Sequence, residues 1–232
     1  MPAGNRWLTG AEAEWLATMR FRKRRTEYLL RRWVGKQAVA TVLGLADDEP
    51  TAARIEVANR TDGSPIVFLD AAPAVGCVSM SDRAGWAVCL VAEERVDVGC
   101  DLELVEPRSD GFVADFLTAA ERDAVRAAGA ERDVVANLMW SAKESVLKVL
   151  RTGLRRDTRS VEITLHRGAA GEWAPLTGRL AEGGELPGWW LRQGAFVLTV
   201  ASARALPPPV ALDGTADLAT ATPVHTWLAD PG

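Results

Sequence analysis

Two short segments of the 232-residue chain carry side chains whose types and spacing could do chemistry on phosphates. One reads VGCDLE and ends at Glu103, and the other reads WSAKESVLK and ends at Lys148. The first pattern predicts a β-strand, on which residues two apart share a face, so Asp101 and Glu103 present two carboxylates together. The second predicts a helix, on which Glu144 and Lys148 lie one above the other because they are four residues apart.

Three oxygen donors that converge favour Mg²⁺, which takes one or two carboxylates and completes its shell with water and substrate phosphates. A lysine one turn away would stabilise a phosphate that is being transferred. Each segment alone is also typical of a solvated strand edge or of a surface ion pair worth about 0.2–0.5 kcal/mol. Read together, they predict a metal-assisted phosphoryl transfer in which Asp101, Glu103 and Glu144 hold the metal.

Other segments share the order and spacing of a known family. Between the two segments lies FLTAAE, which ends at Glu121; upstream lie RRTEYLLRR, which ends at Arg32, the turn Gly63-Ser64-Pro65 and the tetrapeptide SMSD, which ends at Asp82. With them, the chain resembles the 4′-phosphopantetheinyl transferases of the Sfp type over about residues 20–203. The two chemistry-bearing segments match that family's Gly-x-Asp-x-Glu and Trp-x-x-Lys-Glu patterns.

The resemblance implies a fold and an activity. The fold would be α+β, with two similar halves of antiparallel sheets packed with helices and related by a pseudo-twofold axis. The activity would be transfer of 4′-phosphopantetheine from coenzyme A to a serine of an acyl or peptidyl carrier protein, releasing 3′,5′-ADP, with Mg²⁺ as the metal and Mn²⁺ as a substitute. Such an enzyme would serve fatty-acid, polyketide or non-ribosomal peptide synthesis.

The same resemblance assigns roles to particular residues. Glu144 would act as the base that activates the serine hydroxyl, and Lys148 would stabilise the phosphate. Coenzyme A would be bound by basic residues of the Arg-rich segment, by the turn and by two further groups, which together are Arg25, Arg32, Lys36, Gly63, Ser64, Pro65, Ser81, Asp82, Lys143 and Lys148. For Lys143, a local ion pair is the alternative to contact with coenzyme A.

Three residues depart from the family pattern. Asp82 stands where relatives have a histidine that contacts the diphosphate, Arg31 replaces a glycine, and Ser64 replaces a basic residue. A carboxylate beside a diphosphate would repel it unless the carboxylate moves away, is protonated or binds a metal. These departures leave the metal-binding residues in place and point to altered coenzyme A contacts.

The carrier proteins of the family are acidic and present a helix, so the receiving surface should combine apolar and basic side chains. Phe112, Phe116 and Arg122 are the candidates for that surface. For Phe116, burial in the core is an equally good interpretation.

Composition narrows the class of protein. Net charge is −4, which does not favour general binding to nucleic acid, and charged residues make up 25% of the chain. The three cysteines have no CxxC spacing, which is typical of a reducing compartment. No apolar run approaches the ~18 residues that span a membrane. We therefore expect a soluble, cytoplasmic protein, and the resemblance implies that it is a monomer.

Local patterns predict how the elements follow one another. Helices are expected from Thr9 or Gly10, over about 23–43, from about 119 to 129 and over about 131–151; strands are expected at 76–80, 86–92, 98–103, 161–166, 189–191 and 196–203. The domains would be an N-terminal half over 1–108, a C-terminal half over 109–206 and a tail over 207–232.

Other functions fit parts of the pattern. A homologue that binds coenzyme A or a carrier protein with weakened or no catalysis is favoured by Asp82. A Mg²⁺-dependent transferase that uses a nucleotide is disfavoured, because no GxxxxGK[ST] phosphate loop occurs. A purely structural α+β domain would require five ordered segments to match by chance.

Overall fold

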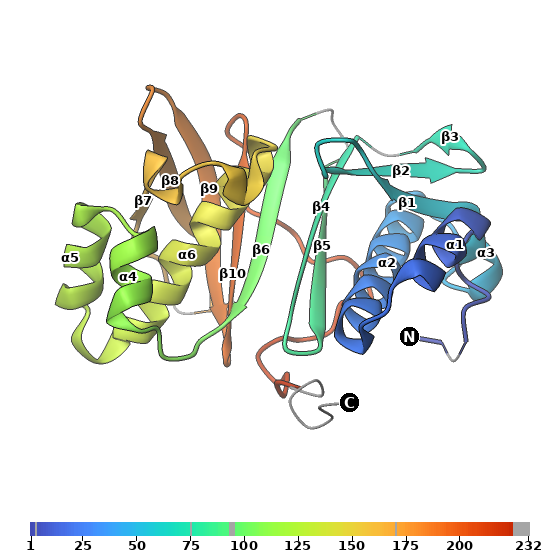
Figure 1. Ribbon diagram of the computed structural model, residues 1–232, viewed down its shortest axis with the longest axis horizontal. Coiled ribbons are helices and arrows are strands. Elements are labelled where there is room, and N and C mark those ends of the chain that lie inside the picture. Colours follow the sequence, from blue (N-terminus) through green and yellow to red (C-terminus); the bar gives the residue numbers. More distant parts are fainter. Residues whose placement is uncertain (3, 75, 93–95, 170, 225–232) are drawn as a thin grey trace. The chain divides into compact units, whose positions relative to one another are not determined.

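The computed structural model describes residues 1–2, 4–74, 76–92, 96–169 and 171–224. Its contacts divide the chain into two compact units (Figure 1). Unit 1 comprises Met1–Arg95, Ala211–Thr215 and the residues from Pro223 onward, and unit 2 comprises Val96–Val210 and Ala216–Thr222. Both units are α+β and all their strand pairs are antiparallel, as the sequence predicts.

Unit 1 packs helices against two small sheets. Its helices are α1 (Gly10–Thr18), α2 (Arg22–Val42) and α3 (Glu49–Arg54), and its strands are β1 (Ile55–Asn59), β2 (Pro65–Leu69), β3 (Ala72–Pro73), β4 (Cys77–Arg83) and β5 (Trp86–Ala92). One sheet has the order β1-β2-β3, and β4 pairs with β5. Its core lies between α2 and both sheets, where Val39, Ile55 and Val78 are buried together.

Unit 2 packs a long helix against a five-stranded sheet. Its elements are β6 (Val98–Leu104), α4 (Asp110–Phe116), α5 (Ala119–Ala127), α6 (Arg132–Val149), β7 (Val161–Leu165), β8 (Ala174–Leu180), β9 (Glu185–Gln193) and β10 (Phe196–Ser202). The strand order is β6-β10-β9-β8-β7. Leu117, Val146, Val161 and Leu176 share its main core, so α6 is packed on the sheet along most of its length.

The same buried motif, a capping glutamate paired with a lysine, positions the main helix of each unit. In unit 1, Thr9 and Glu12 form a capping box at the start of α1, and in unit 2, Thr118 and Glu121 form one at the start of α5. Each glutamate then reaches a backbone N–H of a neighbouring strand, at 3.0 Å for Glu12 and 2.7 Å for Glu121. Each glutamate also forms an ion pair with a buried lysine of the long helix that follows.

The sequence around this buried motif is similar in the two units. LTGAE at 8–12 corresponds to LTAAE at 117–121, and WVGKQ at 33–37 corresponds to WSAKE at 140–144. Lys36 and Lys143 occupy the same place in these motifs, and both have 0% exposure. The repeat was missed in the sequence because the capping box of α1 was not recognised. The pseudo-twofold relation between the halves stays a prediction.

The chain after β10 contributes to both units. Leu218 is buried, and a side chain at Gly194 would meet the backbone of Ala219, both within unit 2. Further on, the Val224 N–H donates to the Ala84 carbonyl of unit 1 at 2.8 Å. The predicted division at residue 108 stays a prediction, and in the structure the strand of Asp101 belongs to the sheet of unit 2. Residues 225–232 of the predicted tail lie outside the described residues.

Several elements were not predicted. The helix α3 and the strands β1, β2, β3 and β8 lie in stretches for which the patterns gave no element, and α4 lies largely within a stretch, 112–132, that was treated as one helix. The other expected helices and strands are present, with ends shifted by a few residues. No helix of the described residues is long and apolar enough to cross a membrane.

Candidate active site

The predicted chemistry-bearing residues meet within unit 2, between β6 and α6. Asp101 and Glu103 lie on β6, and Glu144 and Lys148 lie on α6. Gly99 explains why the strand and the helix approach so closely. A Cβ atom at this position would lie 2.0 Å from the Ser145 carbonyl oxygen and 2.9 Å from the Lys148 Cβ, so any side chain would push α6 away.

The helix α6 is also tied to β10, the strand that pairs with β6. The Ser141 hydroxyl lies 2.9 Å from the Thr199 hydroxyl, and the Ser145 hydroxyl donates to the Thr199 carbonyl at 3.1 Å. Thr199 is in register with Asp101 on the neighbouring strand. These bonds fix the rotation of α6 on the sheet, and therefore the direction in which Glu144 and Lys148 point.

Lys148 joins the helix to the strand. Its ammonium donates to Asp101 Oδ1 at 2.9 Å and to the Cys100 carbonyl at 2.7 Å. Burial alone would lower the pKa of Lys148, but the charges of Asp101 and of Glu144 outweigh it, so the pKa is raised. Lys148 is therefore held as a fixed cation at the site.

Glu144 is the least satisfied acid of the site. Its Oε1 is buried and has no hydrogen-bond partner among the described residues. Burial, together with the nearby carboxylates of Asp101 and Glu103, raises the pKa of Glu144 to about 6, against the opposing effect of Lys148. A buried carboxylate with a raised pKa and an unused oxygen is suited to accept a proton or to bind a cation.

Glu103 is held by two side chains whose role the sequence did not reveal. The Trp140 indole donates to Glu103 Oε1 at 2.9 Å, and the Arg108 guanidinium donates to Oε2 at 3.1 Å. Arg108 also donates to Asn137 at 2.7 Å, which anchors it to α6. The Trp140 ring also packs against both Phe112 and Phe116.

Asp101, Glu103 and Glu144 together have the chemistry of a magnesium site. These described side chains are not, however, arranged as three ligands of one metal ion. The three side chains supply hard oxygen atoms, and the unpartnered Glu144 oxygen is one that a cation would satisfy. No group of three or more His, Cys, Asp and Glu side chains in the described parts of the chain is placed to hold a metal ion. Glu103 is the member that is already occupied, by Trp140 and Arg108.

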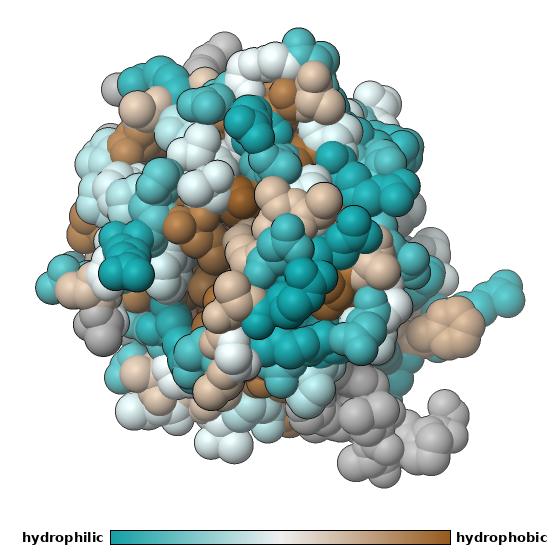
Figure 2. Space-filling view, turned by 90° about the vertical axis from the view of Figure 1, so that its left-hand side faces the viewer, coloured by the Kyte–Doolittle hydropathy of each residue, from teal (hydrophilic) through white to brown (hydrophobic). Residues whose placement is uncertain are grey.

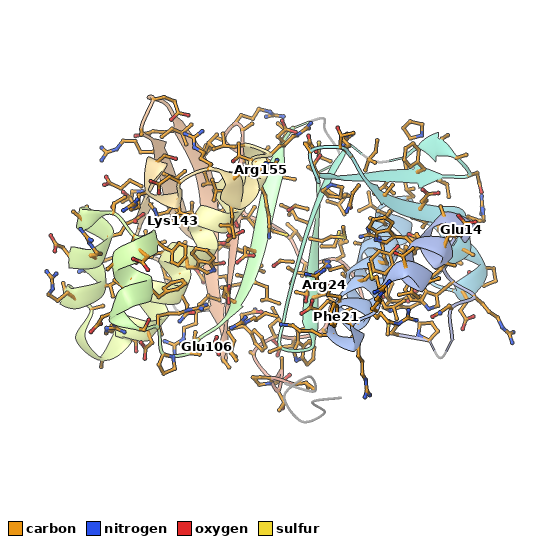
Figure 3. The ribbon with its side chains drawn as sticks, in the orientation of Figure 1. Glu14, Phe21, Arg24, Glu106, Lys143 and Arg155 are labelled. Carbon is orange, nitrogen blue, oxygen red and sulfur yellow. The ribbon has the colours of Figure 1, made fainter. Side chains whose placement is uncertain are left out.

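Two lysines expected to bind coenzyme A are instead buried inside the protein. Lys143 pairs with Glu121 at 2.9 Å and donates to the carbonyls of Thr158 and Val161; Figure 3 marks it in unit 2. Burial lowers the pKa of Lys143, an effect that Glu121 opposes. This matches the local ion pair that was the alternative for Lys143. A fully buried ammonium with three internal partners differs from the expected phosphate contact.

Lys36 has the corresponding environment in unit 1. It pairs with Glu12 at 2.5 Å and donates to the carbonyls of Trp7 and Ala52, each at 2.9 Å. Burial lowers the pKa of Lys36, and the charge of Glu12 opposes this. Its position inside the unit likewise differs from the expected role in binding phosphate.

The other expected coenzyme A residues all lie in unit 1. Arg25 donates to the carbonyls of Leu16 and Met19, and Arg32 is buried against Tyr28 with a bond of 3.3 Å to Asn59. A second group lies in the turn before β2 and on β4, and consists of Gly63, Ser64, Pro65, Ser81 and Asp82.

The turn and β4 each show one feature relevant to binding. The carboxylate of Asp62 closes the turn by accepting from the Ser64 N–H at 2.8 Å. On β4, Asp82 pairs with Arg31 of α2.

The residues expected to meet a carrier protein lie in and after α4. Phe112 and Phe116 are half-buried, with ring centroids 4.9 Å apart, and Arg122 is half-buried on α5. The side of the molecule that carries α4 and α5 shows hydrophobic areas among hydrophilic ones (Figure 2). Both interpretations of Phe116 therefore keep some support, since the ring is partly exposed and also packs on Trp140.

A comparison with protein families points to the same chemistry. A family model described as the 4′-phosphopantetheinyl transferase superfamily matches residues 97–193, which include β6, α6 and all four residues of the site. The match supports phosphopantetheinyl transfer in general and does not distinguish the Sfp type. No curated protein matches the chain.

Proposed function

We propose that the protein transfers 4′-phosphopantetheine from coenzyme A to a serine hydroxyl of an acyl or peptidyl carrier protein and releases 3′,5′-ADP. The observation that carries the proposal is the pairing of Lys148 with Asp101 beside the buried, unpartnered Glu144, within the segment that matches the family model. The protein would act as a cytoplasmic monomer.

The residues of the site have separate tasks in this reaction. Glu144 takes the proton of the serine hydroxyl, because its pKa of about 6 leaves it ionised at neutral pH and its Oε1 is not otherwise engaged. Lys148, oriented by Asp101, stabilises the charge on the phosphate oxygens and on the leaving 3′,5′-ADP. Asp101, Glu103 and Glu144 would hold Mg²⁺, which when bound would neutralise part of the diphosphate charge.

Carrier proteins would meet the aromatic group of unit 2. Phe112 and Phe116 are apolar and partly exposed, and Arg122 adds a positive charge that suits an acidic partner. Because Trp140 contacts both rings and also donates to Glu103, this surface is continuous with the site.

A mass spectrum tests the proposal directly. An apo carrier protein is incubated with the protein, coenzyme A and Mg²⁺, and we expect the carrier to gain one phosphopantetheine unless a chelator is present. The Glu144→Gln variant should lose most of this transfer. Absence of transfer across several apo carriers would overturn the proposal.

A second candidate is a homologue that binds coenzyme A or a carrier protein without transfer. The observation in its favour is that both oxygens of Glu103 are already engaged, by Trp140 and Arg108. Calorimetric binding of coenzyme A with no gain of mass on any carrier would favour this candidate.

A further inference from the structure

The two side chains that hold Glu103 come from different segments of unit 2 and pack on the same ring. Arg108 donates to Glu103 Oε2 at 3.1 Å, and Trp140 donates to Oε1 at 2.9 Å. The centre of the Phe112 ring lies 4.7 Å from the central carbon of the Arg108 guanidinium and 5.2 Å from the centre of the Trp140 ring. Both donors to Glu103 are therefore held in place by a shared aromatic contact.

The segment after β6 brings Arg108 back to the strand that the chain has just left. Figure 3 labels Glu106 in this segment, and the Glu106 carbonyl accepts from the Asn137 amide of α6 at 2.8 Å. The Arg108 carbonyl accepts from the Arg132 guanidinium at 2.9 Å. The Asn137 side-chain oxygen in turn accepts from Arg108 Nε at 2.7 Å. Arg108 is thus fixed to α6 through its backbone and through its side chain, and its guanidinium is held at Glu103.

Arg108 and Glu103 form an ion pair that is largely shielded from water. Their side chains are 15% and 12% exposed. In such surroundings a carboxylate without a cation is costly, so the guanidinium compensates the charge of Glu103. Lys148 does the same for Asp101, at 2.9 Å. Two of the three acids of the site are consequently neutralised by cations of the protein itself.

A divalent cation bound by Glu103 would meet Arg108 at the same carboxylate. Both oxygens of Glu103 already accept a hydrogen bond, and one of these bonds carries a positive charge. A metal ion and a guanidinium on one carboxylate repel each other, and this repulsion is strong where little water screens it. The ion pair with Arg108 therefore opposes the use of Glu103 as a metal ligand.

We infer that Arg108 is a positioning residue that competes with the divalent cation for Glu103. It compensates and orients the carboxylate before a cation binds, and it gives up the ion pair when Glu103 turns to the cation. The guanidinium then keeps its contacts with Asn137 and with the Phe112 ring. The inference rests on the proposed function for the identity of the cation, which is Mg²⁺ or Mn²⁺.

Binding of Mn²⁺ alone tests the competition without any turnover, and the electron paramagnetic resonance signal of the free ion measures it. Arg108→Ala should lower the Kd of Mn²⁺ about 3- to 30-fold, because the competing charge is removed from Glu103. Arg108→Lys guards against a fold defect of Arg108→Ala. It should lower the Kd by a smaller factor, since a lysine keeps the charge but lacks the fork that reaches Glu103 and Asn137 together.

A double-mutant cycle separates competition for Glu103 from a general effect of charge. In a Glu103→Gln background, Arg108→Ala should have at least about threefold less effect on the Kd of Mn²⁺, because no ion pair remains to be broken. The matched control is Arg126→Ala, which removes the same charge from an ion pair of the same unit. Arg126 pairs with Asp123, and the two side chains are 77% and 70% exposed. This control should leave the Kd as in the wild type.

The Trp140 indole reports on Glu103 from the other oxygen. Its ¹H–¹⁵N signal is identified by its loss in Trp140→Phe and should shift as Mg²⁺ is added, because Glu103 turns to the cation. In Arg108→Ala the shift should be complete at a lower concentration of Mg²⁺. A structural role of Arg108 alone would not move this concentration.

The outcomes separate this inference from the proposed function. An unchanged Kd of Mn²⁺ in Arg108→Ala, an equal decrease in the Glu103→Gln background, or a Trp140 signal that does not respond to Mg²⁺ would overturn the inference while transfer continued. Tighter Mn²⁺ binding by Arg108→Ala, with no transfer to any carrier by the wild type, would support the inference and overturn the proposed function. Absence of Mn²⁺ binding in every variant would overturn the inference, and the mass spectrum of the carrier decides the proposed function independently.

Discussion

The two units contain the same buried scaffold but differ in what they build on it. In each, a capping glutamate bridges a helix start, a strand N–H and a buried lysine. The residue after that lysine is Glu144 in unit 2 and Gln37 in unit 1, and the residue five positions after it is Lys148 in unit 2 and Thr41 in unit 1. The buried scaffold is therefore present in unit 1 without an acid and a cation at these positions, whereas unit 2 carries Glu144 and Lys148 on it.

The difference in electrostatics follows from these additions. Gln37 is neutral and its amide lies 3.3 Å from Asp47 at the surface. Glu144, in contrast, is an acid whose pKa is raised to about 6 by burial and by two nearby acids, although Lys148 opposes the shift. In unit 1 the basic residues of α2, which include Arg31, come before Gln37 in the helix.

The largest expected effect comes from breaking the shared scaffold. Lys36→Met and Lys143→Met should each lower the free energy of unfolding by about 3–5 kcal/mol, because each leaves a buried glutamate without its partner. Urea denaturation followed by circular dichroism measures the loss. Lys23→Met, at a side chain that is 50% exposed, is the control. A large loss of stability for one lysine variant and a negligible loss for the other would show that the two buried ion pairs are not equivalent.

The next effect separates chemistry from scaffold at matched positions. Glu144→Gln should lower the rate of phosphopantetheine transfer by about 100- to 1000-fold, because the base and a donor to the cation are lost together. Gln37→Glu, the reverse exchange in unit 1, should leave the rate unchanged. Single-turnover transfer to an apo carrier measures both. Near-normal turnover of Glu144→Gln would remove Glu144 from the mechanism.

A smaller effect distinguishes the two close helix–strand contacts. Gly99→Ala should destabilise unit 2 by about 1–3 kcal/mol, since the new methyl group meets the backbone of α6. Gly35→Ala should change stability by less than about 1 kcal/mol, because the flexible Met80 side chain can move and alanine favours the helix. Thermal unfolding of the two variants compares them. Equal losses would mean that the backbone approach at Gly99 relaxes easily.

The smallest effect is a dependence of stability on pH. The folded pKa of Glu144 is raised from 4.5 to about 6, so the folded state binds its proton more tightly than the unfolded state. The stability that this provides is complete below about pH 4.5 and is lost as pH rises through about 6. With chelator present, Glu144→Gln should therefore exceed the wild type in stability by on the order of 1 kcal/mol at pH 8, a value reduced for partial exposure.

At pH 4 that advantage of Glu144→Gln should vanish, because wild-type Glu144 is then protonated in both states. Urea unfolding at the two pH values measures the difference. Glu185→Gln, at the exposed start of β9, is the control and should match the wild type at both. An advantage of Glu144→Gln that is equal at pH 4 and pH 8 would show that the carboxylate is not the cause.

The site was largely predictable because its spacing is local. Asp101 and Glu103 follow strand alternation and Glu144 and Lys148 follow helix periodicity, so their placement needed only the correct element types. The partners of Glu103 could not be predicted, since the path of the loop that follows β6 decides whether Arg108 returns to the strand. The contact between Arg31 and Asp82 likewise depends on the register of α2 on β4.

The unpredicted elements lack clear local signals. β8 contains Pro175 and Gly178, residues that usually weaken a strand, and Gly178 is there because a Cβ atom would lie 2.7 Å from Val146 of α6. β1 has alternating burial but follows α3 without a break, so its start was hidden. Lys36 and Lys143 were expected to contact coenzyme A because a lysine in a basic or catalytic segment suggests a ligand contact, whereas both form ion pairs in the core.

The path of the chain after β10 has a consequence for protein synthesis. The ribosome makes the helices and sheets of unit 1 first, yet the N–H that pairs with the Ala84 carbonyl belongs to Val224, near the end of the chain. The tail also supplies Leu218 to unit 2 before it reaches Val224. During translation, unit 1 can therefore form this hydrogen bond only after the residues of unit 2 have been made.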